Sequence, residues 1–145
     1  MCNYFSLSLF AGASLLMAAT AQAADNSWTD RQASAALTRA GSAVSTRYQA
    51  GKMAGQIPAD AVITQVYANR RYAGDATVHT QLCWNGTTRC VDLLGEHLNT
   101  QAFNGLDPSQ PMYLKHTVTN WGQSFPPLFV VGNVNVWFTS QSQHP

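Results

Sequence analysis

The chain has 145 residues, a length that fits one domain. It carries 8 Lys and Arg and 7 Asp and Glu, which gives a net charge of +1, with no basic stripe and no acidic run. This balance gives no electrostatic reason to expect nucleic acid or an anionic membrane as a partner.

The N-terminal segment has the pattern of a secretory signal peptide. Residues 4–19 form an uncharged, mainly apolar run, and Ala21-Gln22-Ala23 supplies small residues at the two positions that a signal peptidase reads. The run is shorter than the roughly 20 apolar residues that a membrane-spanning helix needs. One departure is that residues 1–23 contain no Lys or Arg. We therefore predict cleavage after Ala23 and a soluble product in the periplasm.

The segment that follows does not favour one secondary structure. Residues 30–40 are rich in Ala and have helical propensity, whereas residues 41–51 are rich in turn-forming and β-branched residues. Gly51, Gly55 and Pro58 then indicate a loop.

After this loop the chain reads as a series of short strands. Val134, Val136 and Phe138 alternate with residues expected on the opposite face, which is the period of a half-buried strand. Turn sequences separate the strands, and this spacing predicts an all-β protein built as an antiparallel sandwich or barrel. The predicted strands cover residues 61–68, 77–84, 89–94, 111–119, 127–131 and 133–139.

Cys83 and Cys90 flank the turn sequence Asn-Gly-Thr-Thr. In an exported protein, two nearby cysteines form a disulfide by default. A redox pair would favour closer spacing at a helix N-terminus, and the flanks here are strand-like. Zinc would need two further ligands, but no paired motif is formed by the four histidines, which are His79, His97, His116 and His144. We predict a disulfide, because a turn at Gly86-Thr87 and a four-residue loop over 85–88 both place Cys83 opposite Cys90.

From Ile63 onward the chain resembles the FlhE family, small periplasmic proteins of bacterial flagellar operons. The residues that carry the resemblance are Leu82-Cys83, residues 89–95 (RCVDLLG), Thr100, Phe103 and residues 126–138 (PPLFVVGNVNVWF), with looser matches at Trp28 and residues 39–41. The cysteine loop is longer here than in the family, and the chain continues past Phe138. The resemblance implies a single antiparallel β-sandwich domain over residues 24–138, followed by a polar tail over residues 139–145. It also implies that residues 33–40 are strand or coil and not helix.

No catalytic arrangement stands out in the sequence. Asp92 and Glu96 flank a glycine in a predicted turn, but no motif pairs them with a nucleophile or a second acid. His79 and His116 lie within strands and are interpreted as sheet positions and not as ligands. We therefore expect no enzyme activity, no catalytic or metal-binding residues, no cofactor and no small-molecule substrate.

Three residues are candidates for contact with a partner protein. Arg70 and Arg71 form the only adjacent basic pair, and Trp121 lies in a predicted loop, where an aromatic side chain can anchor an interface. The resemblance implies a non-enzymatic flagellar accessory that limits proton leakage through the type III export apparatus and supports flagellum assembly and swarming. Its partners would be export-apparatus or basal-body proteins. The alternative is a periplasmic chaperone or binding module that holds a secreted subunit by strand addition.

Overall fold

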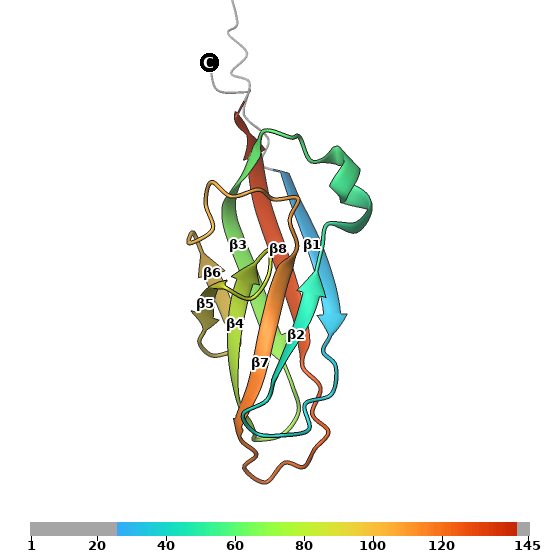
Figure 1. Ribbon diagram of the computed structural model, residues 1–145, viewed down its shortest axis with the longest axis vertical. Coiled ribbons are helices and arrows are strands. Elements are labelled where there is room, and N and C mark those ends of the chain that lie inside the picture. Colours follow the sequence, from blue (N-terminus) through green and yellow to red (C-terminus); the bar gives the residue numbers. More distant parts are fainter. Residues whose placement is uncertain (1–25, 142–145) are drawn as a thin grey trace, which may run out of the picture.

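The fold is a two-layer β-sandwich, seen in a computed structural model that describes residues 26–141. Two four-stranded antiparallel sheets pack face to face, and the strands run along the long axis of the molecule (Figure 1). The predicted all-β antiparallel sandwich is therefore confirmed. The predicted signal peptide, its cleavage site after Ala23 and residues 142–145 of the predicted tail lie outside the described residues.

Each sheet combines strands from distant parts of the chain. The first sheet has the order β1 (Asn26–Ala33), β8 (Val131–Ser140), β3 (Ala61–Arg71) and β6 (His97–Thr100). The second sheet has the order β2 (Ala43–Tyr48), β7 (Met112–Asn120), β4 (Thr77–Trp84) and β5 (Arg89–Leu93). A short 3₁₀ helix, η1 (Gly51–Gln56), lies where the sequence indicates a loop.

The structure differs from the sequence-based expectation in several strands. The predicted strand over residues 127–131 is wrong: this segment is coil with a single bridge between Leu37 and Leu128, and β8 begins only at Val131. Prolines at 126 and 127 explain this, because they have no backbone N–H to donate to a sheet. The strand β6 was not predicted, and β8 includes the first two residues of the expected tail, Thr139 and Ser140.

The segment with ambiguous propensity contains the strands β1 and β2 with coil between them. Residues 34–40 form no helix, as the family resemblance implied. Backbone hydrogen bonds tie the two ends of this coil to distant parts of the chain: Ser34 N–H donates to Val130 O at 2.8 Å, and the adjoining Gly41 N–H donates to Val118 O of β7 at 2.9 Å. Tertiary pairing therefore overrides the helical propensity of the alanines.

The interior contains two apolar clusters with a polar layer between them. On β4, Thr80 lies between the inward residues Val78 and Leu82, and on β7 His116 lies between Leu114 and Val118. The larger cluster includes Trp28, Tyr48, Ile63, Leu82, Phe103, Leu114 and Phe138. The smaller cluster, toward the end where β3 and β7 finish, consists of Leu37, Ala76, Val78, Val118, Leu128 and Val130.

Candidate functional site

The cysteine pair forms a disulfide that closes the β4–β5 hairpin. The Cα atoms of Cys83 and Cys90 are 4.1 Å apart, and the two residues face each other in the strand register. Trp84 pairs with Arg89, so the connection is the four-residue loop 85–88. This confirms the predicted disulfide and its register. Both Asn85 and Gly86 adopt positive φ angles, which Asn and Gly tolerate better than other residues.

Removing the disulfide is expected to weaken the fold without abolishing it. The double substitution Cys83→Ser/Cys90→Ser should lower the free energy of unfolding by about 2–3 kcal/mol, because the closed loop is short. Urea denaturation of the chain from Ala24 measures this loss, and wild-type protein unfolded in reductant serves as the control and should lose about as much. Two titratable thiols in the unreduced, denatured protein, or stoichiometric zinc, would contradict the assignment.

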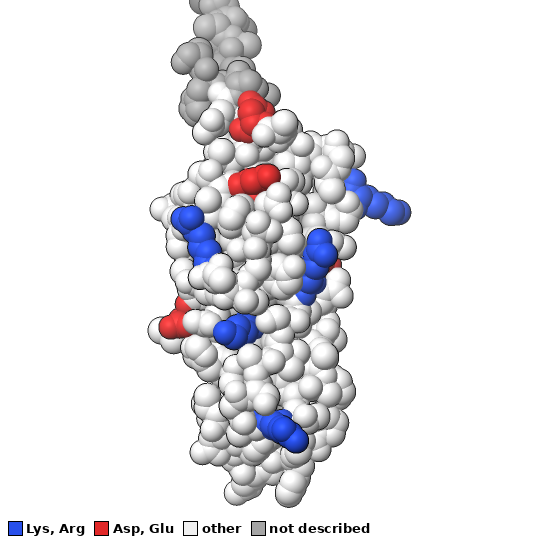
Figure 2. Space-filling view, viewed as in Figure 1, with Lys and Arg blue, Asp and Glu red and all other residues white. Residues whose placement is uncertain are grey.

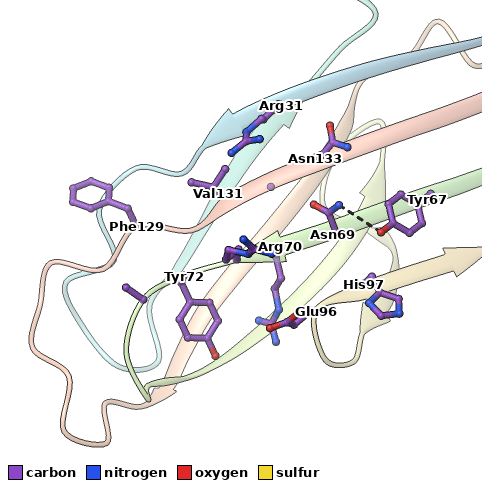
Figure 3. A pocket seen from close by; sticks show the side chains of 13 residues that line it. Arg31, Tyr67, Asn69, Arg70, Tyr72, Glu96, His97, Phe129, Val131 and Asn133 are labelled. Carbon is purple, nitrogen blue, oxygen red and sulfur yellow. Dashed lines mark hydrogen bonds between the residues drawn. The ribbon is translucent and has the colours of Figure 1, made fainter.

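The adjacent arginines of β3 point to opposite sides of the first sheet. Arg71 is exposed, whereas the Arg70 side chain is half-buried and reaches across the sandwich toward β4 (Figure 3). The guanidinium of Arg70 donates hydrogen bonds to Gly95 O at 2.9 Å, to Val78 O and to Thr80 Oγ1 at 2.6 Å. It also lies 5.6 Å from the centre of the Tyr72 ring, a cation–π distance. Arg70 therefore joins the two sheets, and Arg71 carries the free charge of the pair.

The hydrogen bonds of Arg70 continue to a buried histidine. Thr80 Oγ1 lies 2.8 Å from His116 Nδ1. Since the arginine can only donate, Thr80 Oγ1 accepts from Arg70, and the donor in its contact with Nδ1 depends on the tautomer of His116. The other ring nitrogen of His116, Nε2, is buried without a partner. Burial, reinforced by the positive charge of Arg70, lowers the pKa of His116 to about 4.

Trp121 begins a loop at one end of the sandwich, residues 121–130, which we call the aromatic end loop. The Trp121 side chain is half-buried and packs on the smaller apolar cluster. Asp75 holds the loop from the neighbouring β3–β4 connection: its carboxylate accepts hydrogen bonds from Gln123 N–H at 2.9 Å and from the Ser124 hydroxyl at 3.1 Å. The far end of the loop is fixed by Ser34 Oγ, which accepts from Val130 N–H at 2.9 Å.

The aromatic end loop displays two phenylalanines to solvent. Phe125 is 85% exposed and Phe129 is 52% exposed, while Leu128 between them is buried. Most large aromatic side chains of a sandwich are buried, so two exposed rings on one fixed loop form an unusual surface. Because the loop is held at both ends, the rings are presented without the cost of ordering a flexible segment.

An open groove with a volume of about 780 Å³ lies between this loop and the outer side of the first sheet. Figure 3 shows Phe129 at one end, Arg31 and Asn133 along one side, and Glu96 and His97 along the other. Arg71 also lines it. Among residues 26–141 the only ion pair joins His79 and Asp92, at 3.1 Å, so Arg31 and Arg71 have no carboxylate partner there. The groove thus offers two unpaired cations beside an exposed aromatic ring.

The other polar side chains of residues 26–141 form no arrangement typical of catalysis or metal binding. Asp92 is on the outer side of β5, where it accepts hydrogen bonds from Gln81 and interacts with His79. In the part of the chain that the structure describes, no group of three or more His, Cys, Asp or Glu side chains is placed to hold a metal ion. The described helix is also too short and polar to cross a membrane. On the face seen in Figure 2, basic and acidic side chains are scattered and form no field of one sign.

Comparison with known proteins identifies the family. A family model described as "Flagellar protein FlhE" matches residues 34–138, which is most of the chain. The chain belongs to the FlhE family. The resemblance inferred from the sequence motifs is thereby confirmed, and the match includes both β3 and the aromatic end loop. No curated protein matches the chain.

A solved FlhE-family fold agrees with the architecture. The structure named "Crystal Structure of FLHE" superposes with a TM-score of 0.63 at 22% sequence identity, and the aligned region covers 81% of this chain and 98% of that chain. At this identity the likeness supports the shared sandwich fold. The protein is accordingly a member of a flagellar family with the FlhE fold.

Sequence reasoning proposed Trp121 but not the two exposed phenylalanines of the same loop. In the run Phe125-Pro-Pro-Leu-Phe129, apolar composition alone predicts burial for every residue. Only the bridge between Leu37 and Leu128 shows that the central leucine faces inward, which turns the flanking rings outward. The structure brings Arg70 and Arg71 to the groove together with Phe129, while Trp121, at the start of the same loop, packs on the smaller apolar cluster.

Proposed function

We propose that this FlhE-family protein acts in the periplasm as a non-enzymatic flagellar accessory. In this role it limits proton leakage through the flagellar type III export apparatus and supports flagellum assembly and swarming. Membership of a flagellar family supports the flagellar role. The N-terminal signal pattern supports export to the periplasm.

The observation that carries the proposal is the fixed, exposed aromatic end loop. Aromatic and arginine side chains provide most of the binding energy at protein interfaces, and here Phe125, Phe129 and Arg71 lie at one end of the sandwich. We assign this surface to docking on an export-apparatus or basal-body protein. Blocking a proton path requires a stable body that occupies space and needs no chemistry, which is consistent with a disulfide-closed sandwich.

A deletion strain tests the physiological role. Loss of this protein is expected to acidify the cytoplasm when the flagellar export apparatus is present, and the acidification should vanish when that apparatus is also deleted. A pH-sensitive fluorescent protein in the cytoplasm measures the effect. Re-expression of the Phe125→Ser/Phe129→Ser variant should fail to restore the pH. The matched control is Leu94→Ser, since Leu94 is 79% exposed at a different turn, and this variant should restore it.

Three outcomes would contradict the proposal. If cytoplasmic pH and motility are unchanged in the deletion strain, the protein does not limit a proton leak. If crosslinking in cells recovers only secreted subunits and no basal-body protein, the chaperone function replaces the accessory function. If the Phe125→Ser/Phe129→Ser variant restores the pH as well as Leu94→Ser does, docking does not use the aromatic end loop.

A further inference from the structure

The outer side of the first sheet carries three successive rows of side chains, which the strand register defines. The row next to the aromatic end loop contains Arg31, Asn133, Asn69 and His97. The second row contains Thr29, Asn135, Tyr67 and Asn99. The third contains Ser27, Trp137 and Gln65. We call the central part of this surface the amide face, and define it as Gln65, Tyr67, Asn69, Asn99, Asn133, Asn135 and Trp137.

The amide face has an unusual chemistry for the outside of a sandwich. All of its residues are uncharged, and five of them are amides, each with both donor and acceptor atoms. The outer side of the second sheet, by contrast, carries the ionisable residues Arg47, Lys115, His79 and Asp92. Uncharged polar residues such as Gln81 and Thr117 also lie on that outer side, but there they are mixed with the ionisable ones.

Several of these amides have hydrogen-bonding capacity that the protein does not use. Gln65 donates to Asn99, and Asn69 Nδ2 donates to the Tyr67 hydroxyl at 3.5 Å. Within residues 26–141, however, the side chains of Asn133 and Asn135 make no hydrogen bond, and Asn135 Oδ1 is buried without a partner. A buried acceptor without a partner carries a desolvation cost.

Two aromatic rings lie within this amide surface. Tyr67 on β3 and Trp137 on β8 are diagonal neighbours, because Tyr67 pairs with Asn135 and Trp137 pairs with Gln65. Diagonal positions on adjacent strands are about 7–8 Å apart, within reach of large rings. Both side chains are partly exposed. A sugar ring offers an apolar C–H face to such aromatics and hydroxyl or acetamido groups at its edge to neighbouring amides.

Positive charge is confined to one end of the surface. Arg31 ends the first row and Arg71 lies beyond it, both exposed, both lining the groove and neither paired with a carboxylate of the described chain. Glu96 also lines the groove, but it lies near Arg70. A ligand whose neutral part covers the amides and whose carboxylates reach the two arginines would match this pattern.

We propose that the amide face binds a glycan of N-acetylated amino sugars that bears carboxylate groups, which is the chemistry of peptidoglycan. The sugar rings lie over Tyr67 and Trp137, and the carboxylates meet Arg31 and Arg71. An acidic peptide fits less well, because six of the seven residues of the amide face lie on β8 and β3, which are interior strands with no free edge for strand addition.

Co-sedimentation of the purified mature chain with insoluble peptidoglycan sacculi tests this inference. The protein should pellet with the sacculi, and Tyr67→Ala or Trp137→Ala should each weaken binding about tenfold or more, as expected for an interface anchor. Tyr113→Ala is the matched control, because Tyr113 occupies the outer side of β7 in the other sheet. Far-UV circular dichroism and thermal denaturation establish that each variant is folded.

A separate pair of variants tests whether binding requires the positive charge of Arg31. Arg31→Gln should weaken binding and reduce its salt dependence, while Arg47→Gln on the other sheet should not. Soluble muropeptides should compete better than chitin oligosaccharides, which have the same amino sugar without carboxylates.

The inference is overturned if the wild-type protein does not pellet, if Tyr113→Ala weakens binding as much as Tyr67→Ala, or if acidic peptides compete as well as muropeptides. Phe125→Ser should still bind sacculi, which separates this site from the aromatic end loop.

Discussion

Arg70→Met is expected to destabilise the protein by about 3 kcal/mol, whereas Arg71→Met should change its stability by less than about 0.5 kcal/mol. The methionine keeps the apolar stem of Arg70 but removes the donors to Val78 O, Thr80 Oγ1 and Gly95 O. Partly buried acceptors that lose their donor carry a large desolvation cost. Arg71 is exposed and has no carboxylate partner in the described chain, so its loss leaves nothing unsatisfied.

Chemical denaturation of both variants at neutral pH measures this difference. The two arginines are neighbours in the sequence, and both are replaced by methionine. A difference in stability between the two variants therefore reports the direction in which each arginine points. Arg70→Lys adds a further comparison, because lysine retains the charge but not the planar set of donors, and it should recover only part of the loss. Equal stability of the Met variants at positions 70 and 71 would show that the guanidinium does not join the two sheets.

The sequence contains enough information to predict which way the Arg70 side chain points, but not which residues accept its hydrogen bonds. Val66, Ala68 and Arg70 have the same parity along β3, so a regular strand places the arginine on the core side with them. The adjacent basic pair reads instead as a solvated hairpin end, because charged residues are seldom buried. The acceptors that make burial possible belong to β4 and to the β5–β6 turn, and their positions depend on tertiary packing.

Local patterns predicted the parts of the fold that local chemistry determines. The turn sequence over residues 85–88 was sufficient to predict the disulfide register, and the alternation along β8 was sufficient to predict its buried face. The proline pair at 126 and 127 interrupts an otherwise strand-like apolar run, which composition alone did not resolve. The strand β6 contains one apolar residue, Leu98, and forms because it pairs with β3. Long-range pairing of this kind leaves little signal in its own segment.

The candidate binding surfaces likewise combine residues that local sequence patterns identify with contacts that only tertiary packing determines. Trp121 was recognised as a loop aromatic, but its role as the base of the aromatic end loop depends on packing against the smaller apolar cluster. The amide face is formed by residues from three strands, β3, β6 and β8, that lie together only in the folded sheet. Its members on β8 were recognised in sequence as the non-core half of an alternating strand. Their chemistry becomes informative only when β3 and β6 add more amides beside them.

Acidification is expected to destabilise the protein between about pH 6.5 and pH 4, before most carboxylates titrate. The pKa of His116 is lowered from 6.5 to about 4 in the folded protein, so the unfolded chain takes up a proton in this range while the native protein does not. Stability is therefore complete above pH 6.5 and falls as the pH decreases, by about 3 kcal/mol at pH 4. Burial acts to raise the pKa of Asp107, but hydrogen bonds from Ser109 and Gln110 lower it overall. The stability that the ionised Asp107 contributes is therefore lost only at lower pH.

The variant His116→Gln should remove this pH dependence. At pH 7 it is expected to be less stable than the wild type, because glutamine does not fill the imidazole site between Leu114 and Val118, but its stability should change little down to about pH 4.5. Arg70→Met should show an intermediate slope, since it removes the smaller of the two effects that lower the His116 pKa. Urea denaturation from pH 7.5 to pH 4 measures all three proteins. A wild-type slope that His116→Gln leaves unchanged would show that another group takes up the proton.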